Sequence, residues 1–267
     1  MPKLSYSIDK LHMEFRFVPP GVFVMGSISG DPDRNEDEVP HEVEITNTLY
    51  CQTSPVTIKQ YRRFISDTGY STGSDIEYWE LDWKQGKTFD EVNCYGDNYP
   101  VVGVSFLDAL SFIGWLSSLD GHPYRLLTEA EFEYVSRARC DCVAQCKAVS
   151  QCPKERFRMF PEESRKPSSV QTMPPNDFGI YDMNSLIWQW CADWYAPYSS
   201  NNCRNPEGPQ SKPEKTYWRG RMLSGGRVIR GGSFSYPESY SRCSNRHYSF
   251  EEDRNFNVGF RICRTVD

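Results

Sequence analysis

Helical periodicity is confined to three short stretches of this chain, and this limits the folds that it can adopt. Residues 54–69, 105–121 and 128–139 each carry apolar side chains at helical spacing after a Ser or Thr that suits an N-cap. Gly69 and Gly121 stand where the first two helices are expected to end. We therefore predict two main helices and a shorter third one, so strands and loops must build the rest of the fold.

Short strands are expected around these helices. The stretch FRFVPPGVFVMGS predicts two strands joined by a Pro-Pro-Gly turn, and HEVEIT alternates like a half-buried strand, so three strands should precede the first helix. Residues 70–100 are rich in Trp, Tyr, Asp and Gly and predict a long surface loop, while residues 140–176 predict irregular structure. No repeat or linker divides the chain, so we predict one α+β domain over residues 1–267.

Composition argues against two classes of partner. The formal net charge of -6 argues against a general nucleic-acid binder, because neutralising phosphates requires a basic surface. No apolar run approaches the roughly 18 residues of a membrane span, and the N-terminus lacks the apolar core of a signal peptide. We predict neither a nucleic-acid partner nor a membrane span. The compartment stays open, with display on a cell or virus surface as one alternative.

Ten cysteines leave the redox compartment open as well. The densest group runs from Cys140 to Cys152 with the spacing C-x-C-x3-C-x5-C, which lacks the paired C-x2-C of a typical zinc site. Zinc-binding thiolates, loop disulfides and free thiols therefore all remain open for this group.

Residues 227–265, which we name the C-terminal segment, combine a regular frame with irregular contents. The frame consists of arginines that recur among glycines, namely Arg230, Arg242, Arg246, Arg254 and Arg261. The positions between them are mostly Ser, Tyr, Phe, His and Asn, without helical or strand periodicity. This pattern raises the question of why a fold would keep so regular a frame around such assorted side chains.

Several segments, in this order along the chain, resemble the formylglycine-generating-enzyme family, also called the sulfatase-modifying-factor domain. They are FVPPGVFVMGS, PHEVEITNTLYCQTSPVTIKQYRRFI, YPVVGVSFLDALSFIGWLS, YRLLTEAEFEYVSRA, FGIYDMNSLIWQWCADWY and IRGGSF with NVGFRICR. The resemblance implies an α+β, C-type lectin-like fold with much irregular structure. It also implies a small twisted antiparallel sheet, two main helices and a C-terminal segment presented on one face.

This resemblance does not settle function, because the scaffold carries oxidases, sulfoxide synthases and binding proteins. The oxidases hold copper with two cysteines after the GGS motif, whereas the corresponding stretch here, GGSFSYPESYSRCSNR, contains only Cys243. The sulfoxide synthases hold iron with several histidines, and the four histidines here show no i, i+4 spacing. Cys191 is expected to be a buried core thiol. We therefore predict no catalytic residue, no cofactor and no enzyme activity, with an oxidoreductase of this family or a non-catalytic paralogue as alternatives.

The resemblance also implies calcium loops, which this sequence alters. Between two tryptophans, where the family has an acidic ligand, this chain has Gln189, and calcium affinity follows the charge of the ligands. The second calcium loop is replaced by the cysteine-rich insertion. We assign no metal ligand and leave calcium binding open.

The arginine spacing resembles that of another branch of the family, the variable proteins of diversity-generating retroelements. Their segment reads R-G-G-S-aromatic, seven residues, Arg, three residues, Arg, seven residues, Arg, three or four residues and G-F-R, and this chain fits that spacing from Arg230 to Arg261. In that branch a reverse transcriptase copies a template with errors at adenines, so asparagine codons scatter into many residues while the frame persists. The resemblance implies a receptor-like protein that displays diversified residues between positions 235 and 257.

Two sets of site residues follow from this resemblance. The ligand-binding, variable set is Ser235, Tyr236, Pro237, Ser239, Tyr240, Asn245, His247, Tyr248, Ser249, Phe250, Asp253, Asn255, Phe256 and Asn257. The scaffold set is Arg230, Gly231, Gly232, Arg242, Arg246, Arg254, Gly259 and Arg261. Tyrosines with small polar residues suit binding, because rigid aromatic rings give contact area at low entropic cost. The expected partner is an unidentified protein or cell-surface ligand, and outward projection of the variable side chains would favour this interpretation.

Overall fold

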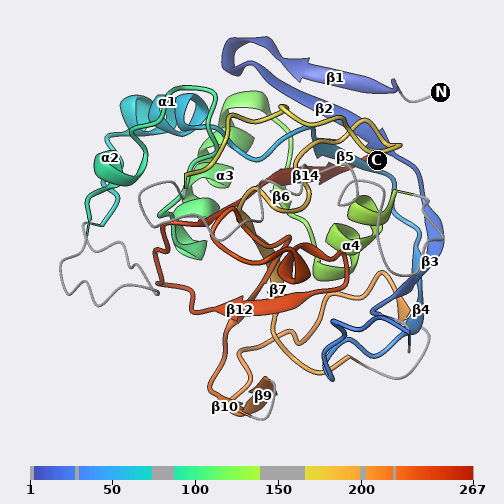
Figure 1. The fold of residues 1–267 in the computed structure, drawn as a ribbon. Coiled ribbons are helices and arrows are strands. Elements are labelled where there is room, and N and C mark those ends of the chain that lie inside the picture. Colours follow the sequence, from blue (N-terminus) through green and yellow to red (C-terminus); the bar gives the residue numbers. More distant parts are fainter. Residues whose placement is uncertain are drawn as a thin grey trace.

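The computed structural model describes residues 3–27, 30–73, 87–138, 166–198, 203–218 and 221–266 of the chain. These residues form four α-helices and fourteen strands, and the strands are distributed over four sheets (Figure 1). The predicted α+β, C-type lectin-like class is confirmed. The cysteine group from Cys140 to Cys152 lies outside the described residues.

The largest sheet joins the two ends of the chain. It consists of β1 (Ser5–Ile8), β2 (Met13–Val18), β5 (Leu49–Gln52), β14 (Ile262–Thr265) and β6 (Arg125–Leu126), in that order across the sheet. Every neighbouring pair is antiparallel. Because β14 pairs with β5 on one side and β6 on the other, the end of the C-terminal segment is fixed inside this sheet.

A second sheet carries the rest of the C-terminal segment. Its order is β12 (Arg246–Ser249), β11 (Arg227–Arg230), β7 (Trp188–Trp194) and β13 (Val258–Gly259), and β13 runs parallel to β7. The remaining strands are β3 (Gly21–Met25), β4 (His41–Ile45) and β8 (Cys203–Arg204) in one sheet, and β9 (Thr216–Trp218) with β10 (Arg221–Leu223) in a small hairpin-like pair. The segment is therefore held by two separate sheets.

The helices begin where local sequence predicts. They are α1 (Ile58–Thr68), α2 (Phe89–Val92), α3 (Phe106–Asp120) and α4 (Glu129–Arg137), and each opens with a capping box in which the N-cap hydroxyl accepts a backbone N–H. Gly69 and Gly121 end α1 and α3 in the left-handed conformation. The three predicted helices are confirmed. The short α2 lies in the expected loop of residues 70–100, of which residues 74–86 are outside the described part.

The expectation of three strands before the first helix is wrong, because five strands precede α1. The strand β5 was missed since all four of its residues are buried, and a strand that is buried on both faces shows no alternation of polar and apolar side chains. In contrast, β4 is half-buried and its alternation was readable.

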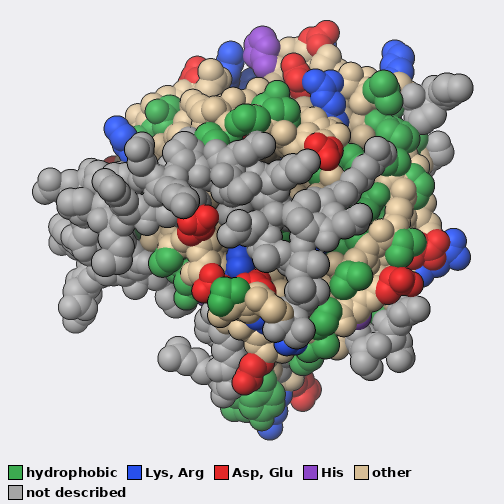
Figure 2. All heavy atoms as spheres, turned by 45° about the vertical axis from the view of Figure 1, so that its right-hand side comes forward, with side chains coloured by type: hydrophobic (Ala, Val, Ile, Leu, Met, Phe, Trp, Pro, Cys, Tyr) green, Lys and Arg blue, Asp and Glu red, His purple; other side chains and the backbone are tan. Residues whose placement is uncertain are grey.

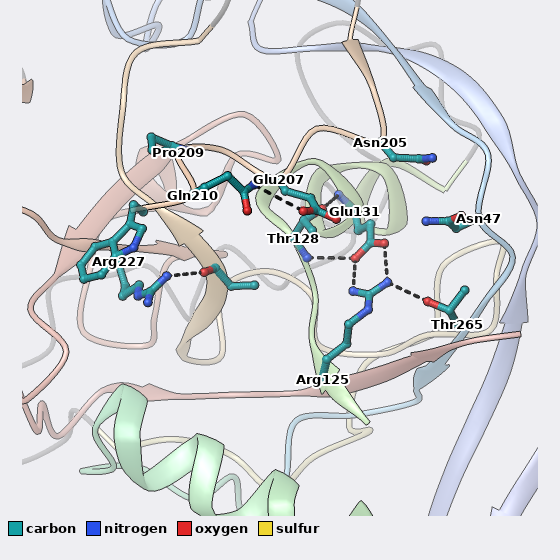
Figure 3. A pocket seen from close by; sticks show the side chains of 12 residues that line it. Asn47, Arg125, Thr128, Glu131, Asn205, Glu207, Pro209, Gln210, Arg227 and Thr265 are labelled. Carbon is teal, nitrogen blue, oxygen red and sulfur yellow. Dashed lines mark hydrogen bonds and ion pairs between the residues drawn. The ribbon is translucent and has the colours of Figure 1, made fainter. Parts of the chain in front are cut away.

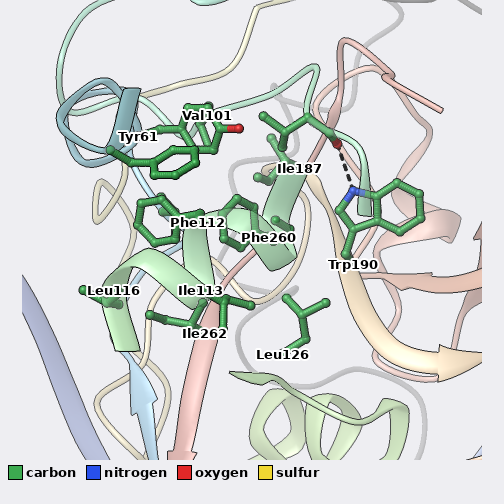
Figure 4. Close-up of a cluster of buried hydrophobic side chains, with 14 of the residues drawn as sticks. Tyr61, Val101, Phe112, Ile113, Leu116, Leu126, Ile187, Trp190, Phe260 and Ile262 are labelled. Carbon is green, nitrogen blue, oxygen red and sulfur yellow. Dashed lines mark hydrogen bonds between the residues drawn. The ribbon is translucent and has the colours of Figure 1, made fainter. Parts of the chain in front are cut away.

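An aromatic cluster packs α1 and α3 against the end of the C-terminal segment (Figure 4). The rings of Tyr61 and Phe112 stack at 5.8 Å, and Phe260 meets Phe112 edge-on at 5.4 Å. The indole N–H of Trp190 donates to the carbonyl of Val104 at 2.9 Å, so its one polar group is satisfied in the core. Phe260, near the end of the C-terminal segment, and Trp190, in the neighbouring strand β7, are thus held in place by apolar burial.

The surface shows no large patch of one charge on the face that Figure 2 presents, since acidic, basic and apolar side chains are interspersed among its described atoms. Within the described residues, no helix has both the length and the apolar character that crossing a membrane requires.

Candidate functional site

The C-terminal segment runs from β11 through a Gly-Gly turn and a short 3-10 helix (Glu238–Ser241) to β12, and then through a turn to β13. At Gly231, φ is +100°, and an added Cβ would lie 2.5 Å from the carbonyl oxygen of Met183. At Gly259, an added Cβ would collide with the carbonyl oxygen of Val101. Both glycines therefore stand where the backbone approaches another strand or loop too closely for a side chain.

Two arginines of the frame bind to helix α4. The Nη2 of Arg230 donates to Oε2 of Glu133, and its Nη1 donates to the carbonyls of residues 244 and 245 at 3.0 and 2.9 Å. Arg246 forms a two-pronged pair with Glu129, at 2.6 and 2.7 Å. Burial raises the pKa of Glu129, but the charges of Arg246 and Arg230 outweigh burial and hold this pKa below its usual value. The carboxylate therefore stays ionised, and its pairing fixes β12 on α4.

Two further arginines bind to other parts of the chain. Arg242 makes a two-pronged pair with Glu38 at 2.7 and 2.8 Å, and it also bonds Asp31 at 2.9 Å. Burial raises the pKa of Glu38, but hydrogen bonds from Arg242 and Ser27 outweigh it, and the pKa is lowered. Arg254 bonds both carboxylate oxygens of Asp108, in the first turn of α3, at 2.8 and 2.9 Å.

The structure brings most of the predicted variable residues together around one cavity of about 220 Å³. Eight of the fourteen line it, namely Tyr236, His247, Tyr248, Ser249, Phe250, Asp253, Asn255 and Asn257. The other six, Ser235, Pro237, Ser239, Tyr240, Asn245 and Phe256, do not line it. We name this space the C-terminal cavity.

Five predicted variable residues do not project outward as expected, because they are almost fully buried: Ser235, Asn245, Ser249, Asn255 and Asn257. Their side-chain polar groups bond mainly within the segment, and the amide oxygen of Asn245 also accepts from Asn35 at 3.5 Å. Asn255 donates to the hydroxyl of Ser249 at 3.0 Å, and Asn257 donates to the hydroxyl of Ser235 at 2.8 Å. Small polar side chains can be buried in this way when each finds a partner.

The aromatic members of the variable set are all half-buried, so none is fully exposed and none is fully buried. They are Tyr236, Tyr240, Tyr248, Phe250 and Phe256. Tyr236 packs edge-on against the buried Trp188 at 5.7 Å, and Tyr248 meets Phe250 edge-on at 5.8 Å. Each ring thus has one part in the core and another part at the surface.

Three residues of the C-terminal cavity were not predicted as site residues: Trp188, Ile229 and Val258. Strand register brings them there, because Val258 pairs with Trp188 and Ile229 pairs with His247. No local signal distinguishes them from core residues, since β7 and β11 are mostly buried on both faces. These three residues, which we call the floor of the cavity, are brought together by the pairing of strands that are distant in sequence.

A second cavity, of about 360 Å³, lies beside α4 and is polar (Figure 3). Arg125 forms a two-pronged pair with Glu131 at 2.6 and 2.7 Å and also bonds the hydroxyl of Thr265 at 3.1 Å. Arg227 is paired with Glu251 at 2.9 Å and stacks on Trp194. Both arginines of this cavity are therefore already neutralised by carboxylates.

The residues after the GGS motif do not fit the copper pair of the family oxidases. Cys243 is the only cysteine in residues 231–246, the stretch that corresponds to the copper site, and it is disulfide-bonded. Copper(I) in such a site requires thiolate ligands, which a disulfide does not supply. In the described part of the chain, no group of three His, Cys, Asp or Glu side chains is arranged to hold a metal ion. Cys191 is fully buried, and burial raises the pKa of its thiol well above the ordinary value.

The altered calcium loop does not fit calcium either. The Nε2 of Gln189 donates to the carbonyls of Asp182 and Met183 at 3.1 and 3.2 Å. Arg261 donates to Oε1 of Gln189 at 2.6 Å and to the carbonyl of Asp182 at 2.9 Å. An amide and a guanidinium therefore occupy the oxygens that a cation would need.

Residues 9–266 match the family described as "Sulfatase-modifying factor enzyme 1-like domain". The chain belongs to this family. The formylglycine-generating enzyme of Bos taurus is 26% identical over 291 residues, which cover 91% of this chain and 72% of the enzyme. The serine/threonine-protein kinase pkn1 of Chlamydia pneumoniae is 28% identical over 268 residues, covering 95% of this chain. The chain spans only 38% of that kinase's length.

Solved structures share the fold of this sulfatase-modifying-factor domain. PvdO from Pseudomonas aeruginosa superposes with a TM-score of 0.75 at 24% identity, over 100% of this chain and 99% of PvdO. Treponema denticola variable protein 1 superposes with a TM-score of 0.71 at 16% identity, over 98% of each chain. The predicted resemblance to both the formylglycine-generating enzymes and a variable protein is confirmed.

The prediction that the chain is not an enzyme is contradicted by these comparisons. It was based on the missing copper cysteines and the few histidines. Proteins named as enzymes match more than nine tenths of this chain, the formylglycine-generating enzyme among them. The loss of one ligand pair therefore does not exclude catalysis for a chain of this family.

Proposed function

We propose that the C-terminal segment is a ligand-recognition surface, diversified by a retroelement, that binds a protein or cell-surface ligand. The observation that carries this proposal is that eight predicted variable positions, between Tyr236 and Asn257, line one cavity. A concave site lined by aromatic rings and a few polar groups is the usual form of a ligand pocket.

The arginine frame supports this proposal on physical grounds. A diversified surface needs fixed contacts that hold its loops whatever the variable residues become. Arg230, Arg242, Arg246 and Arg254 supply such contacts, because each is paired with a carboxylate outside the segment. The side chains between them can then change while the backbone stays anchored. A fold shared with a protein named as a variable protein is consistent with this use.

Sequencing of the gene's 3′ end across the source population, together with its flanking DNA, tests the proposal. We expect substitutions confined to adenine-derived codon positions between codons 235 and 257, with a near-copy template and a reverse-transcriptase gene nearby. The codons of the arginine frame should be invariant. A segment without variation and without a template would overturn the proposal.

A second candidate function is oxidation of a peptide cysteine, and the relative named formylglycine-generating enzyme favours it. The residues after the GGS motif do not fit that family's copper pair, so we derive no reaction step for it. Incubation of the purified protein with a cysteine-containing peptide in air-saturated buffer tests this candidate. Conversion of the cysteine to an aldehyde, detected by mass spectrometry, would support it, and an unchanged peptide would remove it.

A further inference from the structure

Four large aromatic side chains line the C-terminal cavity, beside polar and aliphatic ones. Tyr236, Tyr248 and Phe250 are half-buried, and they line the cavity together with Trp188, which is only 2% exposed. The ring planes of Tyr248 and Phe250 lie at 76° to each other, so the rings that line the cavity have more than one orientation. The face of an aromatic ring carries partial negative charge and attracts cations.

One carboxylate with spare acceptor capacity lines the same cavity. The Oδ2 of Asp253 accepts hydrogen bonds from the hydroxyl of Ser249 at 2.7 Å and from the backbone N–H of Phe250 at 2.8 Å. These two bonds fix the orientation of the carboxylate. Asp253 makes no ion pair with any of the described residues, and its Oδ1 accepts no hydrogen bond from them. The charge of Asp253 is therefore not neutralised by any of the described residues.

An amide adds another acceptor. The Nδ2 of Asn257 donates to the hydroxyls of Ser233 and Ser235 at 3.3 and 2.8 Å. This side chain is 5% exposed, and its oxygen accepts no hydrogen bond within the described part of the chain. No Lys or Arg is among the described residues that line the cavity. The cavity thus offers acceptors, one negative charge and aromatic faces.

The volume limits the size of an occupant. About 220 Å³ is below the roughly 300–1,000 Å³ of pockets that hold drug-sized ligands. One long side chain or one small molecule would fill it. An ammonium or guanidinium group would meet Asp253 and Asn257 as a donor and the rings as a cation.

We propose that the C-terminal cavity binds an organic cation, an ammonium or guanidinium group, with Asp253 as the charge partner. This proposal rests on the proposed function only in taking this cavity as the recognition site. The cation can come from a basic side chain of a protein or from a free amine, and the two sources share the same chemistry.

Calorimetric titration of the purified protein with small probes tests the proposal. The cationic probes are N-acetyl-lysine methylamide, N-acetyl-arginine methylamide and n-butylammonium, and the neutral control is N-acetyl-norleucine methylamide. We expect at least one cation to bind roughly tenfold or more tightly than the neutral probe, because a hydrogen bond to a charged group contributes that much. Equal binding of cations and the neutral probe, or no binding of any, would overturn the proposal. Tighter binding of a capped amino acid than of n-butylammonium would identify a protein side chain as the source.

Two variants locate the effect. Asp253→Asn keeps an acceptor for the Phe250 N–H and removes the charge, so cation binding should weaken roughly tenfold or more while the neutral probe is unaffected. Glu252→Gln removes the same charge from an exposed neighbour that does not line the cavity, and should change cation binding less than about twofold. Equal effects of the two variants would overturn the role of Asp253. Thermal unfolding of both variants checks that they are folded, and Phe250→Leu, which keeps an apolar wall without a ring, gives a second test if Asp253→Asn is unstable.

The two proposals fail separately. An invariant gene segment with tight cation binding would overturn diversification and leave the cation site in place. A diversified gene whose product binds no cationic probe would overturn the cation site and leave the recognition surface in place.

Discussion

Single residues of the arginine frame link the C-terminal segment to parts of the chain that are far away in sequence. The regular spacing of these arginines was readable, but their partners were not. Glu129, Glu133 and Glu38 are separated from their arginines by 97 to 204 positions, and nothing in local sequence indicates such pairs. The arginines of the frame could therefore be predicted from sequence, whereas the carboxylate that pairs with each of them is known only from the fold.

The pair of Arg230 and Glu133 gives a prediction at this scale. Both side chains are fully buried, and Glu133 also bonds Arg137 at 2.6 Å. Glu133→Gln would remove the carboxylate that Arg230 bonds directly and leave this buried guanidinium only the more distant Glu129, at 3.5 Å, so the free energy of unfolding should fall by about 3 kcal/mol. Urea unfolding measures this loss. The matched control is Asp67→Asn in the exposed pair with Arg63, which should cost about 0.5 kcal/mol or less, and equal losses would contradict the prediction.

Among the helices, those with complete local signals were predictable from sequence. A hydroxyl at the N-cap, an apolar stripe and a glycine at the end located α3 closely and located the end of α1, whereas Ser54 and Thr57 both suited the N-cap of α1. Helix α4 was located by its capping box of Thr128 and Glu131. Helix α2 has only four residues, too few to show periodicity, and so was not predicted.

The strands that build the C-terminal cavity show why its floor could not be predicted. Strand β13 has only two residues and pairs in parallel with β7, which is distant in the sequence, so no local pattern indicates this pairing. Fourteen residues were predicted to project from the surface. Eight of them line the cavity instead, because β11, β7 and β13 lie side by side. Sequence patterns indicated which side chains belong to the segment, and sheet order decided which of them meet.

At the scale of the whole molecule, ion pairs join the C-terminal segment to the loop between β3 and β4 and to helices α3 and α4. The pKa values of Glu38 and Glu129 are lowered in the folded protein. Carboxylates with lowered pKa values stabilise the fold above the unfolded value of about 4.3, and this stability is lost as the pH falls below it. Protonation of Glu38 and Glu129 in acid should therefore weaken their pairs with the arginine frame, and this loss should contribute to acid unfolding.

Asp193 gives the opposite dependence on pH and the last prediction. This buried carboxyl accepts the backbone N–H of Glu129 at 2.7 Å, and burial, followed by the nearby charge of Glu129, raises its pKa to about 8. Because the folded pKa exceeds the unfolded value of about 3.9, the stabilisation is complete below pH 4 and is lost as the pH rises to 8. The free energy of unfolding should decrease by up to about 1.4 kcal/mol per pH unit in that window. Asp193→Asn keeps an oxygen for the Glu129 N–H and removes the titration, so urea unfolding at pH 5 and pH 8.5 should show a smaller decrease than in the unmodified protein. The same decrease in both proteins would mean that Asp193 is already ionised at pH 5, and that the neighbouring Arg246 outweighs the burial of its carboxyl.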